Sequence, residues 1–188
     1  MKFTETKLAG AFIVDVDERN DDRGFFARTF CQNEFAAHGL KTAIAQTNMS
    51  FNHAAGTLRG MHFQFPPAAE TKFIRCPLGA LHDVIVDLRP ESATYRQHVG
   101  VELTAHNHRA LYIPERFGHG FITLVDNTVA SYQVGEFYVP GLEGGLRYDD
   151  PDLDIDWPRV PTVISDKDRS WAPLAAQRAT IEAQMVAS

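Results

Sequence analysis

From residue 42 to residue 134 the sequence consists almost entirely of short apolar runs separated by turn residues. Runs of this length, rich in β-branched and aromatic residues and bounded by Gly, Pro, Asn or Asp, indicate β-strands. We expect strands at residues 43–48, 57–63, 71–76, 81–88, 98–103, 110–113, 120–125 and 128–134. Because many short strands follow one another with no long helix between them, the sequence predicts an all-β fold, an antiparallel sandwich or barrel.

The segments on either side of this region are predicted to form fewer and shorter elements. A strand is expected at 11–15, a turn at 20–24, further β-structure at 25–30 and one or two helical turns at 33–38, with Asn33 as the N-cap. The one long helix is expected at 172–185, where spaced apolar residues form a modest amphipathic face. With no repeat or linker, the chain is predicted to be a single domain over residues 1–188.

Composition excludes several classes of function. The net charge of −6 and the lack of basic runs argue against a nucleic-acid partner or an anionic membrane surface. Cys31 and Cys76 lie far apart, so two free thiols are a simpler interpretation than a disulfide. The first residues lack the apolar core of a signal peptide, and no apolar run approaches the roughly 18 residues of a membrane span. A cytoplasmic protein is therefore expected.

The segment from Gly56 to Gln64 combines a cation with a titratable imidazole. Arg59 offers a planar cation for a phosphate or carboxylate, and His62 can exchange a proton near neutral pH. In a regular strand these two side chains would point to opposite faces. If both serve one site, a β-bulge at Gly60 must bring them to the same face. Taken alone, His62 fits a structural histidine better than a functional one.

Other polar residues within strands also have two interpretations. Gln46 and Asn48 fit a strand with one wet face, and Lys72 fits an edge lysine, although its ammonium could stabilise an anion in a cavity. Glycines on both sides of His119 let the backbone turn and favour a ligand contact. Tyr132 fits a barrel-filling tyrosine with one hydrogen bond. Without further evidence, residues 166–168 fit a solvent-exposed segment that leads into the C-terminal helix.

A metal centre is disfavoured. Antiparallel barrels that bind metals need three or more matched ligands, and Gln64 stands where a second histidine of the first cluster would be expected. His62 and His119 without a third ligand make a poor site. His106 and His108 have suitable spacing, but Asn107 between them indicates a turn.

Considered together, motifs spread over about residues 10 to 170 form one pattern. They are Asp22 to Phe26, Gln46 to Asn48, Leu58 to Gln64, Lys72 to Arg75, Asp83 to Arg89, Ile113 to Phe121, Tyr132, Glu143-Gly144, Asp156 to Pro158 and Ser165 to Asp168. This pattern resembles the dTDP-4-dehydrorhamnose 3,5-epimerase family. The resemblance implies a jelly-roll (cupin) barrel with short helices and a C-terminal helix, a homodimer, no cofactor and a nucleotide-sugar substrate. It implies an isomerase of dTDP-rhamnose biosynthesis that inverts C3 and C5 of a 4-keto-6-deoxyhexose.

By the same resemblance, four residues carry out the proton transfers. His62 is the general base and Asp168 is the carboxylate that orients it. Lys72 is suited to stabilise the enolate oxygen that forms from the C4 ketone, and Tyr132 is suited to return a proton on the opposite face. Residues implied to bind the nucleotide diphosphate are Arg23, Gln46, Asn48, Arg59, His119, Glu143 and Lys167, with Tyr138 stacking on the base.

Departures from the family pattern leave alternatives open. Arg28 replaces a usual Glu at a position associated with the nucleotide, which puts the nucleobase in question. A single-centre epimerase, or one that uses a CDP- or GDP-linked keto sugar, is therefore an alternative. A non-catalytic sugar-nucleotide-binding barrel and a metal-dependent oxygenase are the alternatives from other classes.

Overall fold

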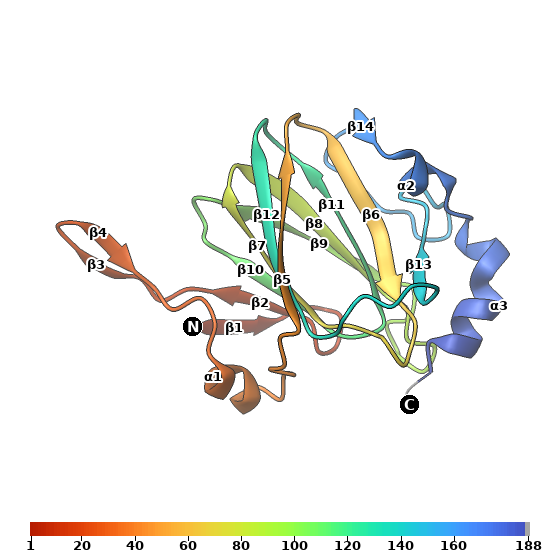
Figure 1. Ribbon diagram of the computed structural model, residues 1–188, viewed down its shortest axis with the longest axis horizontal. Coiled ribbons are helices and arrows are strands. Elements are labelled where there is room, and N and C mark those ends of the chain that lie inside the picture. Colours follow the sequence, from red (N-terminus) through yellow and green to blue (C-terminus); the bar gives the residue numbers. More distant parts are fainter. Residues whose placement is uncertain (187–188) are drawn as a thin grey trace.

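Two antiparallel β-sheets that pack face to face form the body of the protein (Figure 1). The computed structural model describes residues 1–186; residues 187 and 188, which the predicted single domain includes, lie outside the described residues. The first sheet contains, in spatial order, β1 (Lys2–Glu5), β2 (Phe12–Asp15), β10 (Ala110–Ile113), β7 (Lys72–Leu78), β12 (Thr128–Val134) and β5 (Gln46–Asn52). The second contains β13 (Glu143–Gly145), β6 (Thr57–Gln64), β11 (Phe117–Thr123), β8 (Ala80–Asp87) and β9 (His98–Thr104), and β14 (Val163–Ile164) pairs in parallel with β6.

The order of the strands is that of a jelly roll. From β5 to β8 successive strands alternate between the two sheets, and from β9 to β12 they alternate again. Strands that are neighbours in a sheet are therefore distant in sequence; β12, for example, lies between β5 and β7. The predicted fold class, an antiparallel jelly-roll barrel, is confirmed. Residues that lie far apart in the sequence are brought together between the sheets.

All eight strands predicted between residues 42 and 134 are present, and two of them differ from the predicted range by three or more residues at one end or both. β5 covers Gln46–Asn52 rather than 43–48. β11 begins at Phe117 rather than at residue 120, because Gly118 and Gly120 are extended and pair with Val86 and Val84 of β8. The glycines beside His119 therefore do not make the turn that the sequence suggested.

The helices lie outside the barrel. α1 (Gln32–Ala37) agrees with the predicted helical turns, but its N-cap is Cys31 rather than Asn33. α2 (Asp166–Ser170) was not predicted as a helix, and α3 (Leu174–Gln184) is the predicted C-terminal helix. Within residues 1–186 no helix combines the length and apolar character needed to cross a membrane. Both cysteines are free thiols, as predicted.

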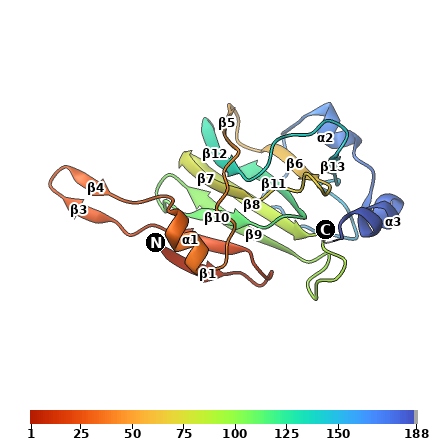
Figure 2. The same ribbon diagram turned by 60° about the horizontal axis from the view of Figure 1, so that its bottom comes forward.

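Alternating side chains build three apolar layers. Ile74, Ile85 and Leu111 belong to the layer between the sheets. Val84 and Val86 point the other way and pack with Leu174 and Ile181 of α3, so α3 covers the outer face of the second sheet (Figure 2). α1 covers part of the outer face of the first sheet through Phe35 and its neighbours. Inward polar residues on these strands therefore face the space between the sheets.

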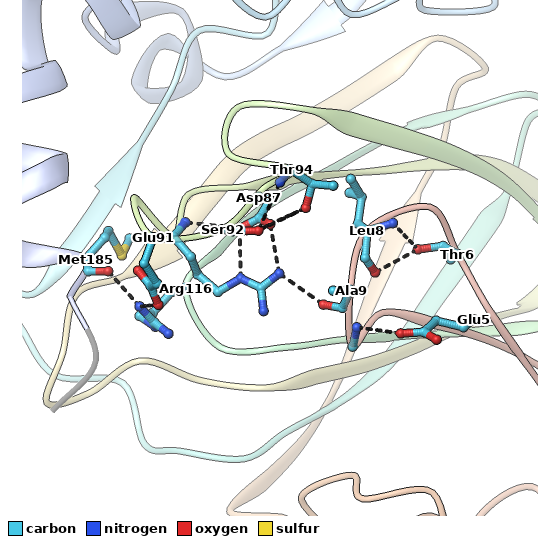
Figure 3. Close-up of polar contacts among 12 residues, drawn as sticks. Glu5, Thr6, Leu8, Ala9, Asp87, Glu91, Ser92, Thr94, Arg116 and Met185 are labelled. Atoms are coloured by element: carbon cyan, nitrogen blue, oxygen red, sulfur yellow. Dashed lines mark hydrogen bonds and ion pairs between the residues drawn. The ribbon is translucent and has the colours of Figure 1, made fainter.

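A buried carboxylate fixes the end of β8. Asp87 is fully buried and accepts hydrogen bonds from Arg89 at 2.7 and 2.8 Å, from Ser92 at 2.6 Å and from Thr94 at 2.7 Å (Figure 3). Burial disfavours the charged carboxylate, but these bonds outweigh it and hold the pKa of Asp87 below its ordinary value. Arg116 nearby bonds Glu91 and the carbonyl of Met185. Arg89 and Arg116 are therefore both paired with carboxylates at this end of the barrel.

A two-stranded hairpin extends away from the sheets. β3 (Arg19–Asp21) and β4 (Gly24–Phe26) pair only with each other among the described strands, and both views show them projecting from the body (Figures 1 and 2). Phe25 and Phe26 of β4 are 46% and 69% exposed, and Asp22 and Arg23 form the turn at the tip of the hairpin. This hairpin contributes nothing to the apolar core of its own chain.

Candidate functional site

A cavity of about 400 Å³ lies between the two sheets. Strands β5, β7 and β12 of the first sheet line it on one side, β6, β11 and β13 of the second sheet line it on the other, and α2 adds residues from the C-terminal segment. The predicted site residues that line it are Gln46, Asn48, Arg59, His62, Lys72, His119, Tyr132, Tyr138, Glu143, Lys167 and Asp168. Only Arg23 of the predicted set is not among the lining residues.

The predicted bulge at Gly60 is present. His62 lies opposite His119 and Arg59 lies opposite Phe121, so β6 has one more residue than β11 between these pairs. As a result Arg59 and His62 both line the cavity, while Met61 packs in the outer apolar layer. Gly60 has φ +126°, and a Cβ there would lie 2.5 Å from the Cα of Gly120. The close approach of these two backbones requires glycine.

His62 forms a pair with a buried carboxylate from another element. Its Nε2 lies 2.6 Å from Oδ1 of Asp168, whose other oxygen accepts a hydrogen bond from the backbone N–H of Gly60 at 3.3 Å. Burial opposes ionisation of Asp168, but its contacts to His62 and Gly60 outweigh burial and lower the pKa of this carboxyl. An ionised Asp168 fixes the imidazole orientation and leaves Nδ1 for proton exchange.

A second histidine and carboxylate pair lies deeper between the sheets. Nε2 of His119 lies 2.8 Å from Oδ1 of Asp83, which is fully buried. Asp83 shares the inward face of β8 with Leu81 and Ile85. No role was predicted for this carboxylate from the sequence. Its inward position among alternating apolar residues was the signal that could have identified it.

Lys72 and Tyr132 face the cavity from the first sheet. Lys72 pairs with Val134 and Tyr132 pairs with Ile74, so the two side chains lie on the same face of neighbouring strands. Nζ of Lys72 lies 3.1 Å from Oε1 of Glu70, and the lysine is 8% exposed. Burial raises the pKa of the Tyr132 phenol above its ordinary value, the charge of Arg59 opposes this and that of Glu70 adds to it. Tyr132 is therefore protonated at neutral pH.

Arg59 differs from the other basic groups that line the cavity. Lys167 bonds Glu143 at 2.9 Å, which lowers the pKa of that carboxyl, and Lys72 and the two histidines each contact their own carboxylate. The guanidinium of Arg59 instead donates from Nε to the neutral amide oxygen of Asn52 at 2.8 Å. An anion in the cavity can therefore neutralise Arg59 without displacing a carboxylate from it.

Several lining residues were not among the predicted set. They include Ser50, Gln64, Glu70 and Trp171. Ser50 follows Gln46 and Asn48 at alternate positions of β5, and Glu70 precedes Lys72 by two residues, so alternation alone could have identified both. Trp171 comes from the C-terminal end of α2, and no spacing in the sequence indicates that it reaches the cavity.

Arg23 lies outside the cavity of its own chain. It follows β3 in the projecting hairpin, its side chain is 90% exposed, and it pairs with Asp21 at 2.6 Å. Arg28, the departure noted in the sequence, pairs with Glu34 of α1 at 3.1 Å and also lies away from the lining residues. Arg23 and Arg59, which are both implied to bind the nucleotide diphosphate, are therefore not brought together within one chain.

Comparison with known proteins adds independent evidence. The family model described as dTDP-4-dehydrorhamnose 3,5-epimerase matches residues 5–176. A protein of that name from Methanothermobacter thermautotrophicus is 41% identical over 92% of this chain and 94% of its own. The crystal structure of such an epimerase from Bacillus anthracis, with TDP and PPi bound, superposes with a TM-score of 0.89 at 41% identity, over 92% of this chain and 99% of that chain.

Another relative carries a different name. A Streptomyces niveus protein named dTDP-4-dehydrorhamnose 3-epimerase is 35% identical over 95% of this chain and 86% of its own. The family match, the identities and the shared fold confirm the predicted resemblance and the predicted isomerase class. Together with the cavity between its two sheets, they show that the chain belongs to the dTDP-4-dehydrorhamnose 3,5-epimerase family.

Proposed function

We propose that this protein converts dTDP-4-dehydro-6-deoxy-D-glucose into dTDP-4-dehydro-L-rhamnose by inverting C3 and C5. The observation that carries the proposal is the joint placement of His62, Asp168, Lys72 and Tyr132 around one cavity. A protein that only binds a sugar nucleotide needs no such set of proton-transfer groups. The C4 ketone of the substrate acidifies the protons at C3 and C5 and accepts the charge that their removal leaves, so the reaction needs no cofactor.

The two sheets separate the base from the acid. His62 faces the cavity from β6 of the second sheet, and Tyr132 faces it from β12 of the first. A sugar ring bound between the sheets would present one face to each. His62 removes the proton from C3 or C5 through Nδ1, and Asp168 stabilises the imidazolium that forms. Tyr132, which is held protonated, returns a proton on the other face and inverts the centre.

Lys72 stabilises the charge that develops on the C4 oxygen. Its ammonium is buried at the side of the cavity that also holds Tyr132. A fixed cation in a partly desolvated site stabilises an enolate oxygen more strongly than water does. Because C3 and C5 both flank C4, one contact at this oxygen serves both proton abstractions.

The nucleotide diphosphate is bound by the remaining polar lining. Arg59 is suited to the diphosphate because its contact in the structure is a neutral amide. Lys167 of α2 and His119 of β11 add hydrogen-bond donors. Gln46 and Asn48 add uncharged hydrogen-bonding groups from β5. Tyr138 is 55% exposed where it lines the cavity, which leaves its ring accessible for stacking on the base.

The active form is proposed to be a homodimer in which Arg23 enters the cavity of the other chain. The hairpin that carries Arg23 projects from its own body, and the two phenylalanines of β4 are exposed. β5 is the edge strand of the first sheet, where Met49 and Phe51 are 72% and 43% exposed. An unpaired edge with apolar side chains favours association with a second copy.

Mixed dimers test this arrangement. We expect Arg23→Ala and His62→Ala homodimers each to lose most activity, and dimers that contain one chain of each kind to regain the activity of one site. In a mixed dimer the Arg23→Ala chain keeps His62 and receives Arg23 from its partner, so one complete site is restored. Activity of co-expressed, doubly tagged dimers measures this. No recovery in verified mixed dimers would contradict the shared site.

Turnover in deuterated water tests the substrate and the number of centres. We expect dTDP-linked 4-keto sugar to be consumed faster than the CDP- or GDP-linked forms, with deuterium at both C3 and C5 of the product by NMR. Label at C3 alone would support the second candidate, a single-centre epimerase, which the relative named a 3-epimerase favours. Preference for a CDP- or GDP-linked sugar would indicate that Arg28, which replaces the family's usual Glu, affects recognition of the nucleobase. The predicted cytoplasmic location stays a prediction.

A further inference from the structure

Glu70 is a carboxylate that lines the cavity but has no role in the proposed reaction. It lies just before β7, and its side chain is 15% exposed. Oε1 of Glu70 lies 3.1 Å from Nζ of Lys72, whose side chain is 9% exposed. The same Nζ lies 3.5 Å from the backbone carbonyl oxygen of His62 on the opposite sheet. Two oxygens therefore hold the ammonium at a defined place between the sheets.

The pair lies next to the proposed acid. Lys72 and Tyr132 occupy diagonal positions on one face of β7 and β12, a separation that long side chains bridge. Groups that can carry charge also line the cavity from every other element around Tyr132. They are Arg59 and His62 of β6, His119 of β11, Glu143 of β13, Lys167 and Asp168 of α2, and Tyr138 from the loop after β12.

We propose that Glu70 is a positioning residue for this reaction: its carboxylate holds the Lys72 ammonium toward the substrate's carbonyl oxygen and sets the charge beside Tyr132. This inference rests on the proposed function, because it assigns Lys72 to the enolate and Tyr132 to the proton return. Glu70 acts through these two side chains and need not touch the substrate itself.

Glu70 is expected to act through two physical effects. The first is geometric: a free lysine side chain has many rotamers, and a hydrogen bond from a fixed carboxylate selects the one that reaches the cavity. The second is electrostatic: the charge of Glu70 raises the pKa of Tyr132, in the same direction as burial and against the charge of Arg59. Loss of Glu70 would therefore both release Lys72 and make the phenol easier to ionise.

Two substitutions distinguish the effects. Glu70→Gln keeps the length of the side chain and removes its charge, whereas Glu70→Asp keeps the charge and shortens the reach. For Glu70→Gln we expect kcat to fall by about 10- to 100-fold with little change in KM, and the alkaline limb of the kcat profile to move to lower pH. For Glu70→Asp we expect a lower kcat with the alkaline limb unmoved. Glu102→Gln, an exposed change on β9, is the matched control.

A second measurement does not depend on turnover. The ultraviolet titration of tyrosinate, taken as the difference between each protein and its Tyr132→Phe counterpart, reports the ionisation of Tyr132 alone. We expect its midpoint to be lower in Glu70→Gln than in the parent. If the parent does not convert the sugar, the proposed function fails while this titration still tests the charge effect. An unchanged kcat or an unchanged midpoint in Glu70→Gln overturns the proposal.

Discussion

Replacement of His62 by alanine is expected to lower kcat by about 10²- to 10⁴-fold, the range typical of a positioned general base. The imidazole of His62, on the second sheet, contacts the ionised carboxylate of Asp168. Its side chain is 44% exposed and is therefore accessible to a substrate. The side chain of His119 is only 10% exposed, so it is much less accessible to a substrate than that of His62. The loss corresponds to about 3 to 5 kcal/mol of transition-state stabilisation.

The measurement follows deuterium uptake at C3 and C5 separately as well as turnover. Both centres should lose exchange, because one base serves both abstractions from the second sheet. His106→Ala makes the same chemical change at an exposed turn and should leave both rates unchanged. Undiminished exchange at either centre in His62→Ala would assign that abstraction to another residue and refute the single-base mechanism.

Local sequence patterns predicted most of the fold and part of the site. Alternation and turn residues gave the central strands, since each strand carries its own signal of period two. Alternation also showed that Arg59 and His62 would point to opposite faces of a regular strand. A bulge at Gly60 was predicted to bring them to one face, and it is present. These predictions succeeded because each depends on a few consecutive residues.

Pairings between distant elements could not be predicted from local patterns. Asp168 meets His62 only because α2 folds back on β6, and the family resemblance rather than any spacing indicated that contact. Asp83 was not predicted as a site residue because a carboxylate in a strand is normally exposed, and its partner His119 lies on another strand. Arg23 illustrates the limit most clearly, since its hairpin leaves its own chain's site.

The pairing of charges explains how an acidic protein can bind a diphosphate. The net charge is −6, yet the basic groups of the cavity other than Arg59 are each matched by one carboxylate. Each pair holds its ammonium or imidazole group in place and adds little net charge to the cavity. Arg59 with its neutral partner then leaves a local positive charge where the anion is expected to bind. The charge of the whole chain therefore says little about the ligand of this cavity.

Replacement of Lys72 by methionine is expected to lower kcat by about 10²- to 10³-fold while KM changes little. Methionine has similar length and volume and fills the buried position, but it carries no charge and donates no hydrogen bond. The developing negative charge on the C4 oxygen would then lose its fixed cation. Binding changes little because the diphosphate is held by other residues, above all Arg59.

The distribution of this loss between the two centres tests the mechanism more sharply than its size. Both carbanions place their charge on the same C4 oxygen, so Lys72→Met should slow deuterium uptake at C3 and at C5 by similar factors. Lys7→Met removes an exposed lysine outside the cavity and is the matched control. A loss confined to one centre would mean that Lys72 donates a proton there rather than stabilising the shared enolate. In that case the acid at that centre would be Lys72 and not Tyr132, although both face the ring from the same sheet.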